Sequence, residues 1–241
     1  MMTFKERILR LLFPPKCICC DGLVDFKADY PHICEKCADK VKISPVRVCH
    51  KCKRPMDLNA YAPYCKYCAG EKLRFKYLVS PLIYDDVCSE IVKKYKYKGQ
   101  TGIAKSLALM LWDRIGQYYP DADFDIIIPA PSSKTKGFKL RSEHMVDLCR
   151  ELSRLSGIPS EELLFKKEGV KNQNSLSAKE RLFNLKGNII YKGGAYNRVL
   201  LVDDVYTTGA TVDECCRMLK KAGCREICVG IITVNIDDEF E

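Results

Sequence analysis

The sequence has no long hydrophobic run. No stretch of the 241 residues approaches the roughly 18 to 20 consecutive apolar residues that a membrane-spanning helix needs. Residues 1–15 also lack the continuous apolar core of a signal peptide, because charged side chains interrupt it at Lys5, Glu6, Arg7 and Arg10. These two absences predict a cytoplasmic protein that does not insert into membranes.

The composition is not that of a disordered chain, because 47% of the residues are apolar and 29% are charged. It predicts a globular protein. A chain of this length can form one full core and still supply a second, small module. The formal net charge is +9, but the first 80 residues hold 16 Lys plus Arg against 8 Asp plus Glu, whereas the remainder holds 24 against 23. This shift predicts a domain of residues 1–75 followed by a domain of residues 76–241.

Cysteine is abundant and unevenly placed: nine of the 15 cysteines lie in the first 68 residues. Eight of them form four CxxC pairs, and the pairs are separated by 13 residues in the first half of this segment and by 12 in the second. Two CxxC turns can place four sulfur atoms in a tetrahedron around Zn²⁺. The repeated spacing therefore predicts two structural zinc sites, with the ligands Cys17, Cys20, Cys34 and Cys37 in one and Cys49, Cys52, Cys65 and Cys68 in the other.

The alternative for these pairs is a set of reduced core cysteines or a redox-active CxxC. Cys19 is expected to be a bystander, with exchange as a ligand as the other possibility, and His32 and His50 are expected to be loop residues rather than ligands. Three roles remain open for this segment: nucleic-acid contact, for which lysines, arginines and tyrosines lie among the cysteines, protein docking, and rigid scaffolding. Apolar residues at Phe4, Ile8, Leu11 and Leu12 predict a short docking helix before the first pair rather than a membrane-surface helix.

From about residue 76 the sequence alternates between apolar strand patterns and helical patterns. Strands are predicted at 76–84, 124–129, 188–192, 198–204 and 226–234, and helices at 87–97, 103–119, 141–155 and 211–222. Continuous apolar strands such as IIIP and VLLV indicate an α/β fold with a parallel sheet covered on both faces. The six remaining cysteines fall within these elements and are expected in the core: Cys88, Cys149, Cys215, Cys216, Cys224 and Cys228.

The most informative segment is VLLVDDVYTTGAT, residues 199–211. An apolar strand delivers Asp203 and Asp204 to its carboxyl end, where ligands bind in parallel sheets. A loop of hydroxyls and Gly209 follows, and Thr211 with Glu214 has the spacing of a capping box at a helix start. Carboxylates for sugar hydroxyls beside backbone N–H groups for a phosphate would suit a pentose 5-phosphate.

This segment resembles the thirteen-residue phosphoribosyl pyrophosphate (PRPP) motif of the type I phosphoribosyltransferases, which has four apolar residues, two acidic residues and a TTGxT loop. Together with the repeated cysteine pairs, it makes nearly the whole chain resemble the ComF (ComFC) family of competence-associated, amidophosphoribosyltransferase-like proteins. The resemblance extends to YKYKG at 95–99 and to a pattern formed by Gln173, Leu176, Ser177, Arg181, Asn184 and Gly187. It implies a parallel-sheet phosphoribosyltransferase fold preceded by a double zinc ribbon.

The resemblance also implies roles for individual residues. Asp203 and Asp204 would hold the ribose hydroxyls, and the 5-phosphate would be wrapped by Val205, Tyr206, Thr207, Thr208, Gly209, Ala210 and Thr211. The pyrophosphate loop would follow the strand that ends at Pro129, with Ala130, Pro131, Ser132, Ser133 and Lys134. The family usually shows RGFNQ near this point and this chain has KGFKLRSEHM, so Lys134, Lys136 and Arg141 all remain candidates for the pyrophosphate-binding cation.

The polar segment 170–182, with Gln173 and Arg181, is expected to be a flexible lid, and a passive surface loop is the alternative. The implied reaction is phosphoribosyl transfer from PRPP with Mg²⁺ and release of pyrophosphate. No acceptor can be identified, and because the chain starts Met1, Met2, Thr3, no N-terminal cysteine is available as a glutaminase nucleophile.

Three other functions remain open. PRPP could bind without turnover. The chain could be a single-stranded-DNA-binding accessory that acts with DNA-uptake proteins, since KKYKYKG at 93–99 interleaves basic and aromatic residues, although a helix end with solvated lysines explains that segment as well. It could also be a regulator that senses PRPP and binds a protein partner.

Overall fold

The computed structural model describes residues 16–17, 19–25, 33–41, 49, 65, 68, 73–98, 101–119, 123–131, 143–167 and 187–235. Three predictions lie outside these residues: the docking helix before Cys17, the loop positions of His32 and His50, and the lid at 170–182.

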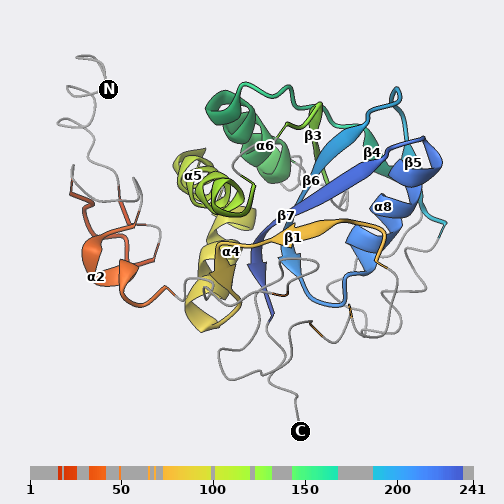
Figure 1. The fold of residues 1–241 in the computed structure, drawn as a ribbon. Helices are drawn as coiled ribbons and strands as arrows, with labels where there is room; N and C mark the ends of the chain where they lie inside the picture. The colour runs from red at the N-terminus through yellow and green to blue at the C-terminus, as the bar shows by residue number, and fades with distance from the viewer. Residues whose placement is uncertain are drawn as a thin grey trace, which may run out of the picture.

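The central element is a parallel sheet with the strand order β1-β7-β6-β3, as Figure 1 shows. The strands are β1 (Tyr77–Val79), β3 (Ile126–Pro129), β6 (Arg198–Tyr206) and β7 (Glu226–Val234). Leu200 and Val202 of β6 belong to one buried apolar cluster, whereas Val199 and Leu201 belong to the other. Because both faces of the strand are covered there, residues 199–202 are apolar at every position, which confirms the predicted parallel α/β fold.

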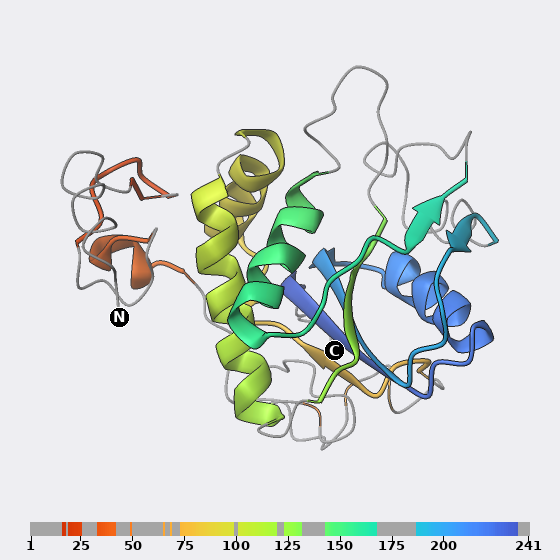
Figure 2. The same ribbon diagram turned by 90° about the horizontal axis from the view of Figure 1, so that it is seen from above.

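Helices lie on both faces of this sheet, and Figure 2 shows them on its two sides. On one side are α5 (Thr101–Tyr118) and α6 (Glu143–Ser156), with α4 (Asp86–Lys98) beside them; on the other is α8 (Ala210–Lys221). The six cysteines expected in the core are all buried. None of the described helices combines the length and the apolar character that crossing a bilayer requires.

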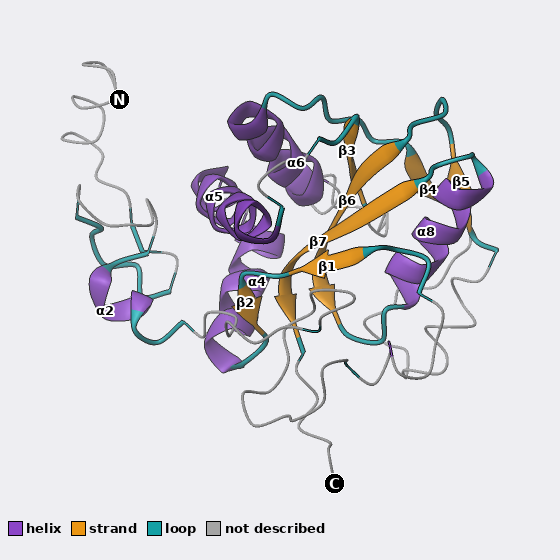
Figure 3. Cartoon of the chain, viewed as in Figure 1, coloured by secondary structure: helices purple, strands orange, loops and turns teal. Residues whose placement is uncertain are grey.

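Two predicted strands need correction, and one strand was not predicted. Residues 76–84 form two short strands, β1 and β2 (Leu82–Ile83), which both pair with β7, because Pro81 between them has no N–H to donate. The strand predicted to end at Asp204 continues to Tyr206, which pairs with Val234. A further strand, β4 (Leu164–Lys166), was not predicted; it pairs antiparallel with β5 (Ile189–Tyr191), and Figure 3 shows this pair away from the main sheet.

Candidate functional site

Asp203 and Asp204 lie near the carboxyl end of β6, where Asp203 pairs with Ile231 of β7. The backbone N–H of Asp204 donates a hydrogen bond of 2.9 Å to Oδ1 of Asp203. The Asp204 side chain is only 15% exposed. Two largely buried carboxylates in sequence require compensating positive charge or protonation.

Asp204 receives that compensation from two side chains on different helices. The Nζ atom of Lys96, on α4, lies 2.8 Å from Oδ2 of Asp204, and Nε2 of His144, on α6, lies 3.2 Å from the same oxygen. Burial alone would raise the pKa of Asp204, but the Lys96 ammonium and the His144 ring hold it below its usual range. Asp204 is therefore the charged member of the pair.

Asp203 has the opposite character. Burial and the neighbouring charge of Asp204 raise the pKa of Asp203 to about 7. Lys166 on β4 also belongs to this electrostatic group: burial lowers its pKa, while the charges of Asp203 and Asp204 act against that decrease. The site therefore combines one firmly ionised carboxylate with one that titrates near neutrality.

Tyr95 connects α4 to α6 beside the carboxylates. Its hydroxyl donates a hydrogen bond to the backbone carbonyl of His144, and the two rings meet edge to face with their centroids 5.5 Å apart. The sequence marks YKYKG as a family feature and as part of a candidate DNA-binding segment, but it does not link Lys96 to Asp204 and it predicts no role for His144. The chain has only three histidines, so their scarcity was the available signal, but nothing in the local sequence links His144 to Asp204.

The loop after β6 leads directly into α8. Gly209 is the N-cap of α8 with φ of 74°, and an added Cβ there would overlap the Tyr206 hydroxyl. This 12-residue helix begins only a few residues after the acidic pair in the sequence. The backbone N–H groups at its N-terminus are suited to binding an anion.

The predicted capping box at Thr211 and Glu214 is wrong, because no side chain caps α8. The Glu214 carboxylate instead accepts hydrogen bonds from the backbone N–H of Gly187, at 2.7 Å, and from Arg217, at 2.6 Å. The Gly187 N–H, from a distant segment, and Arg217, on the same helix, have taken the carboxylate that the local spacing assigned to the helix start.

The predicted pyrophosphate loop is described only at its beginning. Ala130 follows β3 and donates its backbone N–H to the carbonyl of Val202 at 2.8 Å, so the end of β3 lies beside β6 just before the carboxylates. Ala130 and Pro131 are buried. The other predicted members lie outside the described residues: Ser132, Ser133, Lys134, Lys136 and Arg141, together with the lid residues Gln173 and Arg181.

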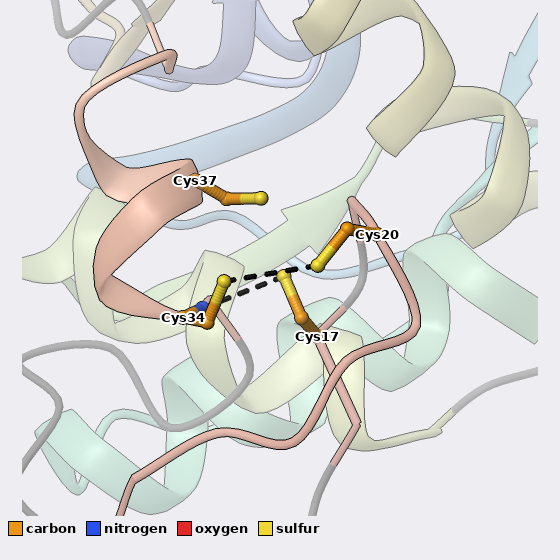
Figure 4. Close-up of side chains that lie close together, drawn as sticks. All are labelled: Cys17, Cys20, Cys34 and Cys37. Atoms are coloured by element: carbon orange, nitrogen blue, oxygen red, sulfur yellow. Dashed lines mark hydrogen bonds between the residues drawn. The ribbon is translucent and has the colours of Figure 1, made fainter.

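The first cysteine cluster joins the turn at 17–20 to the short helix α2 (Glu35–Ala38), as Figure 4 shows. The sulfur atoms of Cys17, Cys20, Cys34 and Cys37 all lie within 4.8 Å of one another. Burial would raise the pKa of Cys17, but backbone N–H groups, led by that of Cys34, lower it to about 6. Four close sulfurs with one stabilised thiolate fit a structural zinc site.

The second cluster repeats this geometry. The sulfur atoms of Cys49, Cys65 and Cys68 also lie within 4.8 Å of one another, while Cys52 lies outside the described residues. The N–H of Cys65 donates to Sγ of Cys49 at 3.3 Å, just as the N–H of Cys34 donates to Sγ of Cys17 at 3.4 Å. The duplication in the sequence is thus a duplication of local structure, and both clusters fit zinc.

Cys19 lies beside the first cluster without belonging to it, and burial together with the nearby Cys17 raises the pKa of its thiol to about 12. Its carbonyl accepts a hydrogen bond of 2.9 Å from Nζ of Lys94 on α4. Lys94 also lies 3.4 Å from Oδ2 of Asp21. This turn is therefore attached to the helix that carries Lys96.

The sheet and the cysteine clusters define an α/β protein of the phosphoribosyltransferase fold with N-terminal zinc ribbons, and comparison with known proteins agrees. Residues 8–69 match the double zinc ribbon domain, and residues 166–238 match the phosphoribosyl transferase domain. The chain belongs to the ComF (ComFC) family.

Three relatives illustrate this membership. The chain is similar to Competence protein F of Haemophilus influenzae, with 29% identity over 88% of this chain and 93% of that protein. It is 27% identical to Competence protein ComFC of Bacillus subtilis over 79% of each chain. The DNA utilization protein YhgH of Salmonella typhimurium is 26% identical over 79% of this chain and 85% of that protein.

Proposed function

We propose that this protein binds PRPP and transfers its phosphoribosyl group with release of pyrophosphate. The observation that carries the proposal is the pair of unequal carboxylates on β6, Asp203 and Asp204, followed directly by the glycine-capped N-terminus of α8. The carboxylates would accept hydrogen bonds from the ribose hydroxyls. The N–H groups from Val205 to Thr211 would bind the 5-phosphate.

Phosphoribosyl transfer develops positive charge on the sugar while pyrophosphate departs, so negative groups are useful on the sugar side and positive groups on the leaving-group side. Asp203 and Asp204 supply the first. Lys134, Lys136 or Arg141, together with Ala130 to Ser133, would supply the second. Mg²⁺ would neutralise part of the pyrophosphate charge when it is bound with PRPP.

Several finer assignments belong to the same proposal. The segment 170–182, with Gln173 and Arg181, would close over bound PRPP and exclude water. The boundary between the two domains would fall between residues 75 and 76, and the protein would act in the cytoplasm. The eight paired cysteines would hold two Zn²⁺ ions with a structural role, because four protein ligands leave no open coordination position.

The decisive experiment measures pyrophosphate release from PRPP and Mg²⁺ across a panel of nucleobases and amines. We expect release with at least one acceptor and a loss of 10-fold or more in the Asp204→Asn variant, since a charged hydrogen-bond partner of the sugar is removed. Release that is no higher than in Asp204→Asn with every acceptor would reject catalysis. PRPP affinity without release would identify a protein that uses PRPP as a regulatory ligand.

A second candidate function is single-strand DNA binding, supported by the names of the competence and DNA utilization relatives. An open cavity of about 600 Å³ lies at the amino end of β7, opposite the carboxylates, and its lining includes Arg74, Lys76, Lys220 and Arg225. Arg74 and Lys76 pair with Asp213 and Glu226, but Lys220 and Arg225 pair with no carboxylate among the described residues. These two cations make the cavity the better candidate surface, because Lys94 and Lys96 of the KYKYKG segment contact Cys19, Asp21 and Asp204.

Titration with labelled single-stranded DNA at increasing salt tests this second function. Phosphate contacts should make the affinity fall steeply with salt, and Arg225→Ala should weaken binding. An affinity that does not depend on salt, or that survives deletion of residues 1–75 together with the Arg225→Ala substitution, would reject it.

A further inference from the structure

We propose that Lys96 is a positioning residue: it holds the Asp204 carboxylate oriented and ionised so that the carboxylate can accept the ribose hydroxyls. This inference rests on the proposed function and deepens it, since it assigns part of the sugar-binding geometry to a helix outside the PRPP motif. The predicted cations all follow β3, whereas Lys96 lies on α4.

The contact geometry supports a positioning role. Lys96 and His144 both contact Oδ2 of Asp204, at 2.8 Å and 3.2 Å. Within the part of the chain that the structure describes, Oδ1 of Asp204 accepts no hydrogen bond. The two donors therefore fix one carboxylate oxygen from two sides and leave the other as the acceptor available to a ligand.

The Lys96 side chain is only 28% exposed, so its attraction to Asp204 is weakly screened by solvent. Asp203 directly precedes Asp204 in β6 and, when it is charged, opposes the ionisation of Asp204 through like charge. Without the Lys96 ammonium, the pKa of Asp204 would rise toward that of Asp203, and the proton that the pair holds would be shared more evenly between the two carboxylates. Asp204 would then spend more time protonated and less well oriented.

Lys94 and Tyr95, the two residues before Lys96, anchor the end of α4 to other parts of the protein. Lys94 binds the cysteine turn through the Cys19 carbonyl and Asp21, and Tyr95 binds the carbonyl of His144 on α6. Successive residues on a helix point about 100° apart, so three neighbouring side chains reach three separate parts of the protein. The end of α4 is thus held in place, which gives the short Lys96 to Asp204 contact a defined geometry.

The test compares Lys96→Met with two matched variants. Lys96→Arg keeps the positive charge, and Lys93→Met removes a lysine one turn away on the same helix, where it contacts only the exposed Glu90 among described residues. Each protein is titrated calorimetrically with ribose 5-phosphate, which carries the sugar hydroxyls, and separately with inorganic pyrophosphate and Mg²⁺. Ribose 5-phosphate isolates the sugar side of the site.

We expect Lys96→Met to weaken ribose 5-phosphate binding about 10- to 100-fold, as for loss of a charged hydrogen-bond partner, with pyrophosphate affinity unchanged within about twofold. Lys96→Arg should recover most of the loss, and Lys93→Met should behave as the wild type. Carboxyl NMR titration should place the pKa of Asp204 higher in Lys96→Met than in the wild type, a change that a purely structural role would not produce.

Three results would overturn the inference. Wild-type affinity for ribose 5-phosphate in Lys96→Met would reject it while leaving the proposed function intact. An equal loss of pyrophosphate affinity would make Lys96 a leaving-group cation instead. Failure of the wild type to bind either PRPP or ribose 5-phosphate would reject the proposed function, and the positioning role would fall with it.

Discussion

The Glu214 carboxylate accepts a hydrogen bond of 2.7 Å from the backbone N–H of Gly187. Glu214 is 5% exposed and also pairs with Arg217 on the same helix. The contact joins the first turns of α8 to Gly187, which lies after the end of the proposed lid segment 170–182 in the sequence. It therefore fixes the start of the chain that leads from Gly187 into β5 against α8.

Replacing Glu214 with Ala should lower the free energy of unfolding by about 1 to 3 kcal/mol, because the Gly187 N–H and Arg217 lose a buried, charged acceptor. Urea denaturation measures this loss. Asp213→Ala is the control, since Asp213 pairs with Arg74 at the surface and such exposed pairs contribute less than about 1 kcal/mol. Equal effects of the two substitutions would contradict a structural role for the Glu214 contact.

Zinc content tests the cysteine clusters. The purified protein should contain about two Zn²⁺ ions per chain, and Cys17→Ser should reduce this to about one, because each site depends on four thiolates. Cys19→Ser is the matched control and should keep both ions. Elemental analysis by mass spectrometry measures the content, and loss of zinc from Cys19→Ser would make Cys19 a ligand.

Removal of zinc should also loosen α4, because Lys94 on that helix contacts the Cys19 carbonyl next to the first cluster. Chelation should increase hydrogen exchange in α4 more than in β7, which lies in the core of the sheet. Equal protection of α4 before and after chelation would show that the cysteine turn does not support the helix.

The raised pKa of Asp203, about 7, predicts how stability depends on pH. A carboxyl whose pKa is higher in the folded than in the unfolded state stabilises the fold below pH 4, and this contribution is lost as pH rises through 7. Asp203→Asn removes this dependence. Its free energy of unfolding relative to the wild type should therefore increase from pH 5 to pH 8, as measured by denaturant titration at both values.

Asp204 provides the comparison for that titration. Its pKa is lowered, so its charge stabilises the fold above the usual aspartate range and this contribution is lost only in strong acid. It is tested in the Asp203→Asn background, because the charge of Asp204 also raises the pKa of Asp203. Adding Asp204→Asn there should change the free energy of unfolding by the same amount at pH 5 and at pH 8. A change that depends on pH over this range would contradict the division into one charged and one titrating carboxylate.

Gly209 should tolerate no side chain. Gly209→Ala must adopt φ near 74° and also place a methyl group against Tyr206, so we expect at least a 10-fold loss of inorganic phosphate or ribose 5-phosphate affinity. Gly223→Ala is the control, because Gly223 also has positive φ, 95°, at the other end of α8 but has no atom within 4 Å of an added Cβ. Unchanged phosphate affinity in Gly209→Ala would contradict the proposed cradle.

Much of the fold could be predicted because the deciding signals are local. The run VLLV in β6 is apolar at every position because helices cover both faces of the sheet, and IIIP in β3 follows the same rule. The spacing of the CxxC pairs likewise predicts close sulfurs, since each pair occupies a single turn. Residues 76–84 have the apolar pattern of one strand, but Pro81 divides them into β1 and β2.

The parts that could not be predicted depend on contacts between distant segments. His144 reaches Asp204 across 60 positions, and Lys96 reaches it from another helix, so no local pattern identifies either residue. Glu214 has the spacing of a capping residue, yet its carboxylate binds Gly187 and Arg217. β4 is three residues long and finds its partner, β5, only after a long intervening segment, so it carries no hairpin signature.

Calorimetric titration of the full-length protein with PRPP and Mg²⁺ tests the central claim, that Asp203 and Asp204 form the sugar side of a PRPP site. We predict binding of one PRPP per chain by the wild type and an affinity at least 10-fold lower for Asp204→Asn. No binding by the wild type, or equal affinity in the wild type and Asp204→Asn, would contradict the claim.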